Sequence, residues 1–283
     1  MTATSDTPVT ITQYTDPMCT WCWGAEPIIR RLRVTYGNQI RFAFVMGGLI
    51  EDFDDFYDVK NDISNPGDVA PHWLEASELH GMPVDTEIFD TDPAYSTYPA
   101  SKAFVAARQQ DEELAHQYLR SLREAYATQV RNINRRETQI ELARSVGLDV
   151  DRFKTVLDNG TAQTEFQDDL SRTRKAGVRS FPTYHIDGST GEKRLEGFQS
   201  FSNLSDALND VAPGLEQRSP PSMKQFIAEF GPVATQEVAE IYNFSRGKAT
   251  QTLQTLAEEG ILRKESRGNG FFWDVFNGNA NRS

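Results

Sequence analysis

The two cysteines of this chain stand two residues apart, in the segment Cys19-Thr20-Trp21-Cys22. A thiolate attacks a disulfide through a mixed-disulfide intermediate, and a second thiol one helical turn away can then resolve that intermediate. The segment lies where an expected strand runs into an expected helix, so the first N–H groups of the helix and its dipole would favour negative charge on Cys19. We therefore expect a lowered pKa for Cys19 and redox activity for the pair.

Two other interpretations of the cysteines need weighing. A structural zinc site usually takes four cysteine or histidine ligands. The chain has no second cysteine pair, and none of its 4 histidines has a partner at ligand spacing, so we expect no metal and no bound cofactor. Two unreactive core cysteines are the other alternative, but both would have to fall at the strand–helix junction by accident.

The elements expected to position the thiols alternate between strands and helices. Residues 9–14 and 40–46 have the pattern of strands, and residues 21–34 between them have the pattern of a helix. This order predicts a parallel βαβ unit. Strand character returns at 183–186 and 193–196. A Cys-x-x-Cys segment beside a βαβ pattern is typical of thioredoxin-like redox proteins.

A helical insertion is expected to separate the two halves of this sheet, over residues 51–176. Helical periodicity and stop signals predict its helices at 101–108, 112–130, 136–146 and 151–157. A helix over 201–211 completes the unit. We expect an α/β domain over residues 1–215, with the helical insertion inside it.

A proline-rich polar stretch over 213–221 separates this domain from a second one, expected at residues 219–276. Three helices and a hairpin are expected in this second domain, at 223–230, 235–242, 245–259, 260–264 and 271–275. Thr235 and Ser245 are expected to cap two of the helices. This order resembles a winged helix-turn-helix module, whose core would contain Leu253, Leu256, Ile261 and Leu262.

Binding of DNA by this winged-helix-like domain would use side chains of the third helix and the wing. They are Arg246, Lys248, Thr250, Gln251, Gln254 and Arg267. Six basic and seven acidic residues give residues 219–276 a net charge of −1, which disfavours DNA without removing it as an alternative. A protein-interaction or dimerisation role is favoured instead.

Four stretches carry a family resemblance. They are the segments Asp16–Gly24, Tyr98–Ala103, Asn132–Asp149 and Gly177–Tyr184. With them the chain resembles the DsbA-like thioredoxin-fold family over about residues 9–211, and it is most similar to the cytoplasmic, FrnE-like branch. The resemblance implies a thioredoxin-like fold and protein thiol–disulfide oxidoreductase or isomerase activity.

The resemblance also implies a role for each matching position. Cys19 would be the exposed attacking thiol, Cys22 the more buried resolving thiol, and Pro182 a cis-proline facing them. Phe181 would present backbone groups to an extended substrate peptide, because an edge strand beside the thiol can capture a peptide by β-augmentation.

The residues around the cysteines depart from the strongly oxidising members of the family. The spacer Thr20-Trp21 lacks their histidine, which argues against strong oxidising power. Trp21 and Trp23 would either form an apolar rim for hydrophobic substrates or pack the helix onto the insertion. Asp16 is best explained as a turn residue, and His185 as a strand residue rather than a catalytic base.

Composition limits the setting and the partners. The 283 residues carry a net charge of −12, which disfavours tight binding to phosphate backbones, and no segment predicts a membrane helix or a signal peptide. We expect a cytoplasmic oxidoreductase that acts on protein or small-molecule disulfides, with an external thiol reductant or oxidant and no membrane. Two alternatives stay open: a proteolysis adaptor, and a redox-sensing DNA-binding regulator.

Overall fold

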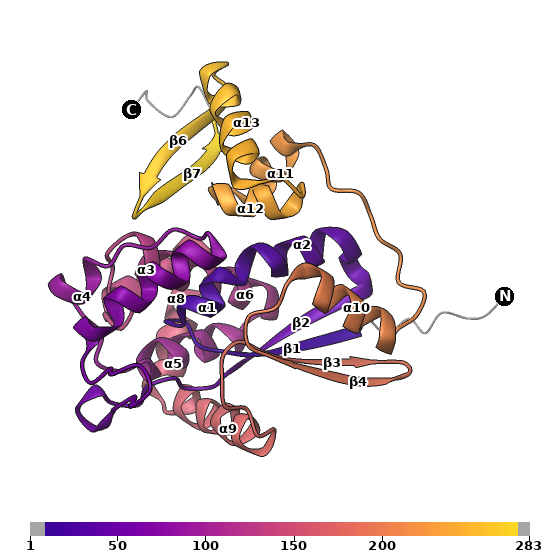
Figure 1. Cartoon of the computed structure of the whole chain (residues 1–283). Helices are drawn as coiled ribbons and strands as arrows, with labels where there is room; N and C mark the ends of the chain where they lie inside the picture. The colour runs from indigo at the N-terminus through magenta and orange to yellow at the C-terminus, as the bar shows by residue number, and fades with distance from the viewer. Residues whose placement is uncertain (1–8, 277–283) are drawn as a thin grey trace.

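A four-stranded sheet lies at the centre of the larger part of the computed structural model, which describes residues 9–276 (Figure 1). β1 (Val9–Thr15) pairs in parallel with β2 (Ile40–Met46), confirming the βαβ unit. β3 (Thr183–Gly188) pairs antiparallel with both β1 and β4 (Gly191–Glu196), so the strand order is β2-β1-β3-β4. The carboxyl end of β1 leads directly to the cysteines.

Two helices, not one, connect β1 to β2. α1 (Thr20–Gly24) ends before Ala25, and α2 (Glu26–Tyr36) begins immediately after it, followed by the 3₁₀ turn η1 (Gly37–Gln39). The expectation of a single helix is wrong here because of Pro27, which is tolerated in the first turn of α2. In a continuous helix its ring would collide with the carbonyl of Trp23, four residues earlier.

The insertion between β2 and β3 is helical, as expected. Two short 3₁₀ turns precede its helices, η2 (Phe53–Asp55) and η3 (Pro66–Asp68). The helices are α3 (Val69–His80), α4 (Ile88–Thr91), α5 (Tyr98–Arg108), α6 (Glu112–Thr128), α7 (Arg136–Ser145), α8 (Val150–Asp158) and α9 (Thr161–Lys175). The four expected helices correspond to α5–α8, whereas α3, α4 and α9 were not predicted. α10 (Phe201–Val211) follows the sheet.

The C-terminal unit, residues 219–276, contains three helices and a small antiparallel sheet. Its elements are α11 (Met223–Phe230), β5 (Val233–Ala234), α12 (Thr235–Ile241), α13 (Arg246–Glu258), β6 (Leu262–Arg267) and β7 (Gly270–Val275). The sheet order is β5-β7-β6. The expected helices and hairpin are therefore present, and the winged-helix class stays a prediction.

The core and the helix caps predicted for the C-terminal unit are present, except for one cap. Leu253 and Leu262 are buried, with Leu256 and Ile261 packed beside them. Ser245 caps α13 by accepting the N–H of Lys248 at 3.2 Å.

The cap expected at Thr235 is wrong. The N-cap residue of α12 is Ala234, whose N–H donates to the Glu237 carboxylate at 2.7 Å. The Thr235 hydroxyl instead accepts a hydrogen bond from the Trp273 indole at 2.8 Å. A buried tryptophan N–H needs a hydrogen-bond partner. The Thr235 hydroxyl serves as that partner for Trp273 and does not cap α12.

The C-terminal unit packs against α2, and the turn between β6 and β7 reaches the chain that follows α3 (Figure 1). At this turn the N–H of Asn269 donates to the carbonyl of Val84 at 3.0 Å, and the N–H of Val84 donates to Asn269 Oδ1 at 2.9 Å. A Cβ on Gly268 would lie 2.4 Å from the same carbonyl oxygen, so only glycine fits this close approach. Across residues 9–276, no helix has the length and apolar character needed to cross a membrane.

Candidate active site

The cysteine pair lies at the N-terminus of α1, directly after β1. Cys19 is the N-cap residue, and its Sγ accepts the backbone N–H of Cys22 at 3.3 Å. Asp16 forms the preceding turn by accepting the N–H of Met18 at 2.9 Å, as expected for a turn residue. The strand, the turn and the first helical turn thus bring the second cysteine back toward the first.

The loop before β3 faces Cys19. The peptide bond between Phe181 and Pro182 is cis, and the Cys19 thiol lies 3.8 Å from the Phe181 carbonyl oxygen, to which it donates. The Phe181 ring fills the space beside Gly47, where a Cβ would overlap it. Residues expected to form the site therefore come together from both halves of the sheet.

The prediction that the strand beside the thiol lies at an edge of the sheet is wrong. β3 lies between β1 and β4, so both of its sides already pair within the sheet. The Pro182 carbonyl also accepts the N–H of Gly197 at 2.8 Å. The exposed residues Arg179 and Ser180, which precede the cis bond, lie outside the strand pairing.

Burial changes the expected acidity of the attacking thiol. Cys19 is only 6% exposed and Cys22 is 0% exposed, and both are free thiols. Cys19 is therefore not the exposed thiol expected from the resemblance. Burial, together with the neighbouring Cys22 thiol, raises the pKa of Cys19 well above its ordinary value, so the expected lowering is wrong.

The two thiols behave as one interacting pair. Burial also opposes ionisation of Cys22, but a hydrogen bond from Cys19 and the positive charge of Arg123 outweigh it and lower the pKa of Cys22. Two sites that interact this closely lose their protons in separate steps. The pair loses its first proton at a lower pH than an ordinary thiol and its second proton at a higher pH.

The two tryptophans of the segment have different surroundings. Trp21 is partly exposed, and its ring lies 5.8 Å from that of Phe198 and 5.9 Å from that of His80, measured between centroids. Trp23 is buried, with its indole N–H donating to the Pro83 carbonyl at 2.8 Å, so it forms no part of a rim. Phe198 and His80 were not predicted, because no local pattern connects them to the cysteines.

Arg123 of α6 is fully buried behind the thiols. It contacts the carboxylate of Glu26 and the hydroxyl of Thr15. Burial alone would raise the pKa of Glu26, but the charges of Arg123 and Arg120 outweigh it and lower that pKa. Arg123 therefore acts both on the redox pair and on a buried carboxylate.

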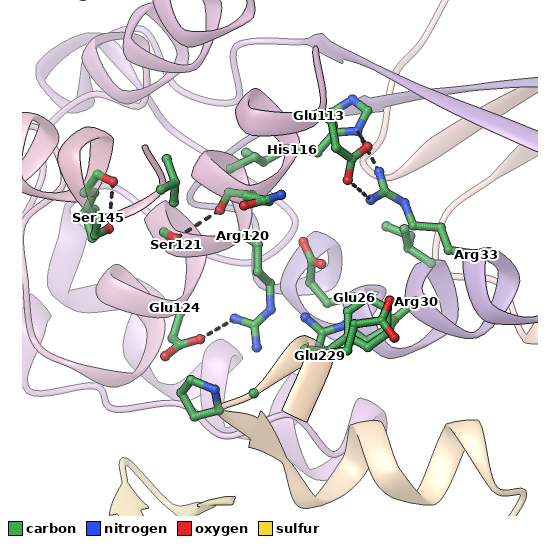
Figure 2. A pocket seen from close by; sticks show the side chains of 18 of the residues that line it. Glu26, Arg30, Arg33, Glu113, His116, Arg120, Ser121, Glu124, Ser145 and Glu229 are labelled. Carbon is green, nitrogen blue, oxygen red and sulfur yellow. Dashed lines mark hydrogen bonds and ion pairs between the residues drawn. The ribbon is translucent and has the colours of Figure 1, made fainter. Parts of the chain in front are cut away.

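Further buried charges join the C-terminal unit to the rest of the molecule. Glu237 of α12 is 0% exposed and pairs with Arg30 at 2.7 Å and with Arg120 at 3.2 Å. Arg120 also pairs with Glu124 at 2.8 Å, as Figure 2 shows, and lies 4.4 Å from the Trp23 ring centroid. A side chain of the C-terminal unit thus connects to a residue that packs beside the cysteines.

A cavity of about 580 Å³ opens at this interface, and neither cysteine lines it (Figure 2). Its wall carries opposite charges, including Arg33, which pairs with Glu113 at 3.1 Å and contacts His116 Nδ1 at 2.6 Å. Residues of both parts of the chain line the cavity, among them four glutamates and three arginines, so it lies within the packing between the two parts. Within residues 9–276, no group of three or more histidine, cysteine or acidic side chains is placed to hold a metal.

Two of the arginines expected at DNA are used inside the molecule. Arg246 donates to the carbonyls of Glu78 and Leu79, each at 2.9 Å. Arg267 contacts Glu124 of α6 and pairs with Glu265 at 2.8 Å. The surface expected to contact DNA is therefore partly occupied by the chain itself.

The fold and the cysteine site define a protein of the thioredoxin-fold class. Residues 13–204 match the sequence profile of a family described as thioredoxin, and the chain belongs to that family. A putative protein disulfide isomerase from Nitrosomonas europaea shares the fold, with a TM-score of 0.62 and 19% identity over 72% of this chain and 97% of its own. The cytosolic disulfide reductase DsbM from Pseudomonas aeruginosa gives a TM-score of 0.54 and 23% identity over 66% of this chain and 89% of its own.

Similarity to curated proteins extends through the C-terminal unit. The ClpXP adapter protein SpxH of Halalkalibacterium halodurans is 28% identical over 270 residues, which are 94% of this chain and 88% of the relative. The protein of the same name from Bacillus subtilis is 26% identical over 272 residues, 94% of this chain and 89% of its own.

Proposed function

We propose that this protein is a thiol–disulfide oxidoreductase that works through Cys19 and Cys22 in the cytoplasm. The observation that carries the proposal is the placement of two free thiols at the start of a helix, opposite the cis-proline loop of a DsbA-like fold. Phe181, whose carbonyl accepts from the Cys19 thiol, the adjoining Pro182 and the partly exposed Trp21 are the proposed contacts for a substrate. The FrnE-like setting expected from the sequence is part of this proposal.

The proposed reaction takes two exchange steps. Once the interacting pair has lost its first proton, the remaining proton moves to Cys22, and Cys19 attacks one sulfur of a substrate disulfide as the thiolate. This forms a mixed disulfide and releases the first substrate thiolate, which takes up the proton of Cys22. Deprotonated Cys22 then attacks Cys19 and releases the second substrate thiol. Two electrons pass to the substrate, the pair is left as a disulfide, and an external thiol reductant restores it.

Insulin reduction tests this proposal. With dithiothreitol as the external reductant, the wild-type chain should accelerate insulin precipitation, and Cys19→Ser should reduce the rate to that of dithiothreitol alone. Cys22→Ser should instead accumulate the mixed disulfide, visible as a covalent adduct in mass spectrometry. Equal rates for wild type and Cys19→Ser, with unchanged unfolding curves, would overturn the proposal.

A second candidate function is that of a proteolysis adapter for ClpXP. The alignment with SpxH proteins favours it, because that alignment spans 94% of the chain and so includes most of the C-terminal unit, whereas the two solved structures cover 72% and 66% of the chain. Here the C-terminal unit would act as a winged-helix-like protein-interaction module. A Cys19→Ser/Cys22→Ser chain that still accelerates degradation of a captured client by purified ClpXP would support this function, and no acceleration by any variant would reject it.

A redox-sensing DNA-binding function has less support. It would need Arg246 and Arg267 to leave their present partners, at least one of which is a carboxylate. The near-neutral charge of residues 219–276 adds no compensating attraction to phosphate.

A further inference from the structure

His80, the last residue of α3, lies against the cysteine segment although it is far from it in sequence. The side chain belongs to a residue only 3% exposed, and its Nε2 lies 3.4 Å from the Thr20 hydroxyl oxygen. Its ring meets Trp21 edge-on and occupies the space above Gly24, where a Cβ would lie 2.4 Å from His80 Cγ. One imidazole therefore contacts three residues of α1.

The hydrogen bonds of His80 define which of its nitrogens carries the proton. The N–H of Met82 donates to Nδ1 at 3.0 Å, so in the neutral ring Nδ1 is the acceptor and the proton sits on Nε2. Nε2–H then donates to Thr20. Burial, aided by the nearby charge of Arg246, lowers the pKa of His80 to about 4, which keeps the ring neutral near neutral pH.

The C-terminal unit fixes the end of α3 that carries His80. Arg246 donates to the carbonyls of Glu78 and Leu79 and, through Nε, to Gln236 at 3.0 Å. A cation is favoured at the C-terminus of a helix, where carbonyls lack helical partners. Gly81 closes the helix at φ +81°, and a Cβ there would strike Gln236 and Arg246, so the packing is close.

We propose that His80 is a positioning residue for the cysteine pair, held in place by the C-terminal unit through Arg246. The proposal rests on the thiol–disulfide exchange proposed above. Thr20 is the first residue of α1, and this first turn directs the N–H of Cys22 at Cys19 Sγ. Anchoring Thr20 therefore maintains the hydrogen bond that favours a thiolate on Cys19.

Alkylation of Cys19 by iodoacetamide, followed against pH, tests this role. In a Cys22→Ser background, where Cys19 is the only thiol, His80→Phe and Thr20→Val should each move the alkylation midpoint to higher pH. The rate at neutral pH should fall about twofold to tenfold, the range for one hydrogen bond. The double variant should fall no further than either single variant, and His80→Gln, which keeps a donor, should recover most of the rate.

Two outcomes would overturn the proposal: an unchanged profile in Thr20→Val, or independent effects that multiply in the double variant. Thr20→Val keeps the size of the side chain, so it remains informative if His80→Phe does not fold. Failure here is distinct from failure of the proposed function, because insulin reduction by the wild-type chain compared with Cys19→Ser is measured separately.

Discussion

Glu237 at the interface and Asp16 beside the cysteines are both completely buried carboxylates, but their partners differ. Glu237 faces two arginines, Arg30 and Arg120. Asp16 accepts hydrogen bonds from the N–H of Met18, the N–H of Leu49 and the hydroxyl of Thr97, all of them neutral. Opposite charges therefore compensate Glu237, whereas hydrogen bonds from neutral groups compensate Asp16 more than the charge of Arg123 does.

This difference has consequences for protonation. Burial raises the pKa of Asp16 despite its three hydrogen bonds, whereas the charges of two arginines lower the pKa of Glu26 despite burial. The two arginines thus keep Glu26 ionised down to a lower pH than an ordinary glutamate. Asp16, beside the cysteines, therefore takes up a proton at a higher pH than an ordinary aspartate does.

The largest expected effect comes from removing the charge at the interface. Glu237→Gln removes a fully buried carboxylate from two largely buried arginines, whose side chains are each 12% exposed, and we expect the free energy of unfolding to fall by about 3–5 kcal/mol in urea denaturation. Glu240→Gln, in the same helix, breaks only a partly exposed pair with Arg31 and should cost at most about 1 kcal/mol. Equal losses of unfolding free energy in the two variants would contradict the special importance of the buried charge at the interface.

Opposite pH trends are expected from the two kinds of carboxylate. The folded pKa of Glu26 lies below its ordinary 4.5, so its stabilisation is present above about that pH and is lost as the pH falls through the folded value. We expect Glu26→Gln to cost about 2 kcal/mol near neutral pH, and the deficit to shrink in acid.

Asp16 should behave in the reverse sense. Its folded pKa is raised above 3.8, so its contribution is fully present below that pH and is lost as the pH rises through the folded value. Urea denaturation at several pH values should show Asp16→Asn gaining on the wild type as pH rises. The same trend for Asp16→Asn and Glu26→Gln would refute the assignment.

A smaller effect is expected where the β6–β7 turn meets the insertion. Gly268→Ala introduces a Cβ at φ +54° and against the Val84 carbonyl, whereas Gly260→Ala has φ +73° and open space around it. Both variants carry the cost of a left-handed residue, about 1 kcal/mol, and Gly268→Ala should lose about 1 kcal/mol more. Matching melting temperatures would show that this turn does not hold the unit in place.

The smallest expected effect concerns Arg123, which lies between the redox site and the charged interface. Arg123 acts on Cys22 as well as on Glu26, so Arg123→Met should raise the pH midpoint of thiol alkylation by about half a unit. Arg120→Met removes an interface charge that does not act on Cys22 to the same extent and should leave the midpoint in place. A shifted alkylation midpoint in both variants would show that charges at the interface also affect the acidity of the thiols.

The sequence predicted elements with strong periodicity and missed three helices, α3, α4 and α9. The alternating strand β2 and the amphipathic helix α10 have the expected boundaries. α9 was missed because its apolar face consists of Ala162, Phe166 and Leu170 within an otherwise polar stretch. Such a narrow stripe becomes a helix only when β2 and α5 are present to cover it.

The site shows the same limit at the level of single residues. Trp21 and Trp23 stand two positions apart in one segment, yet one is partly exposed and the other is buried under Arg120. Their local sequence gives both the same amphipathic character. Which side of α1 is covered depends on the insertion and on the C-terminal unit, both distant in the chain.

The sequence by itself determined the reactive pair, its place at the end of a strand and the start of a helix, and the proline loop opposite it. The pair and its place follow from residue types and local spacing, whereas the proline loop was implied by the family resemblance of residues 177–184. Only the tertiary structure decided that Cys19 is buried, that His80 contacts its helix, and that Arg246 and Arg267 pack inward. Desolvation and charge pairing depend on neighbours brought together by folding, so the acidity of a thiol and the use of an arginine are properties of the packed molecule.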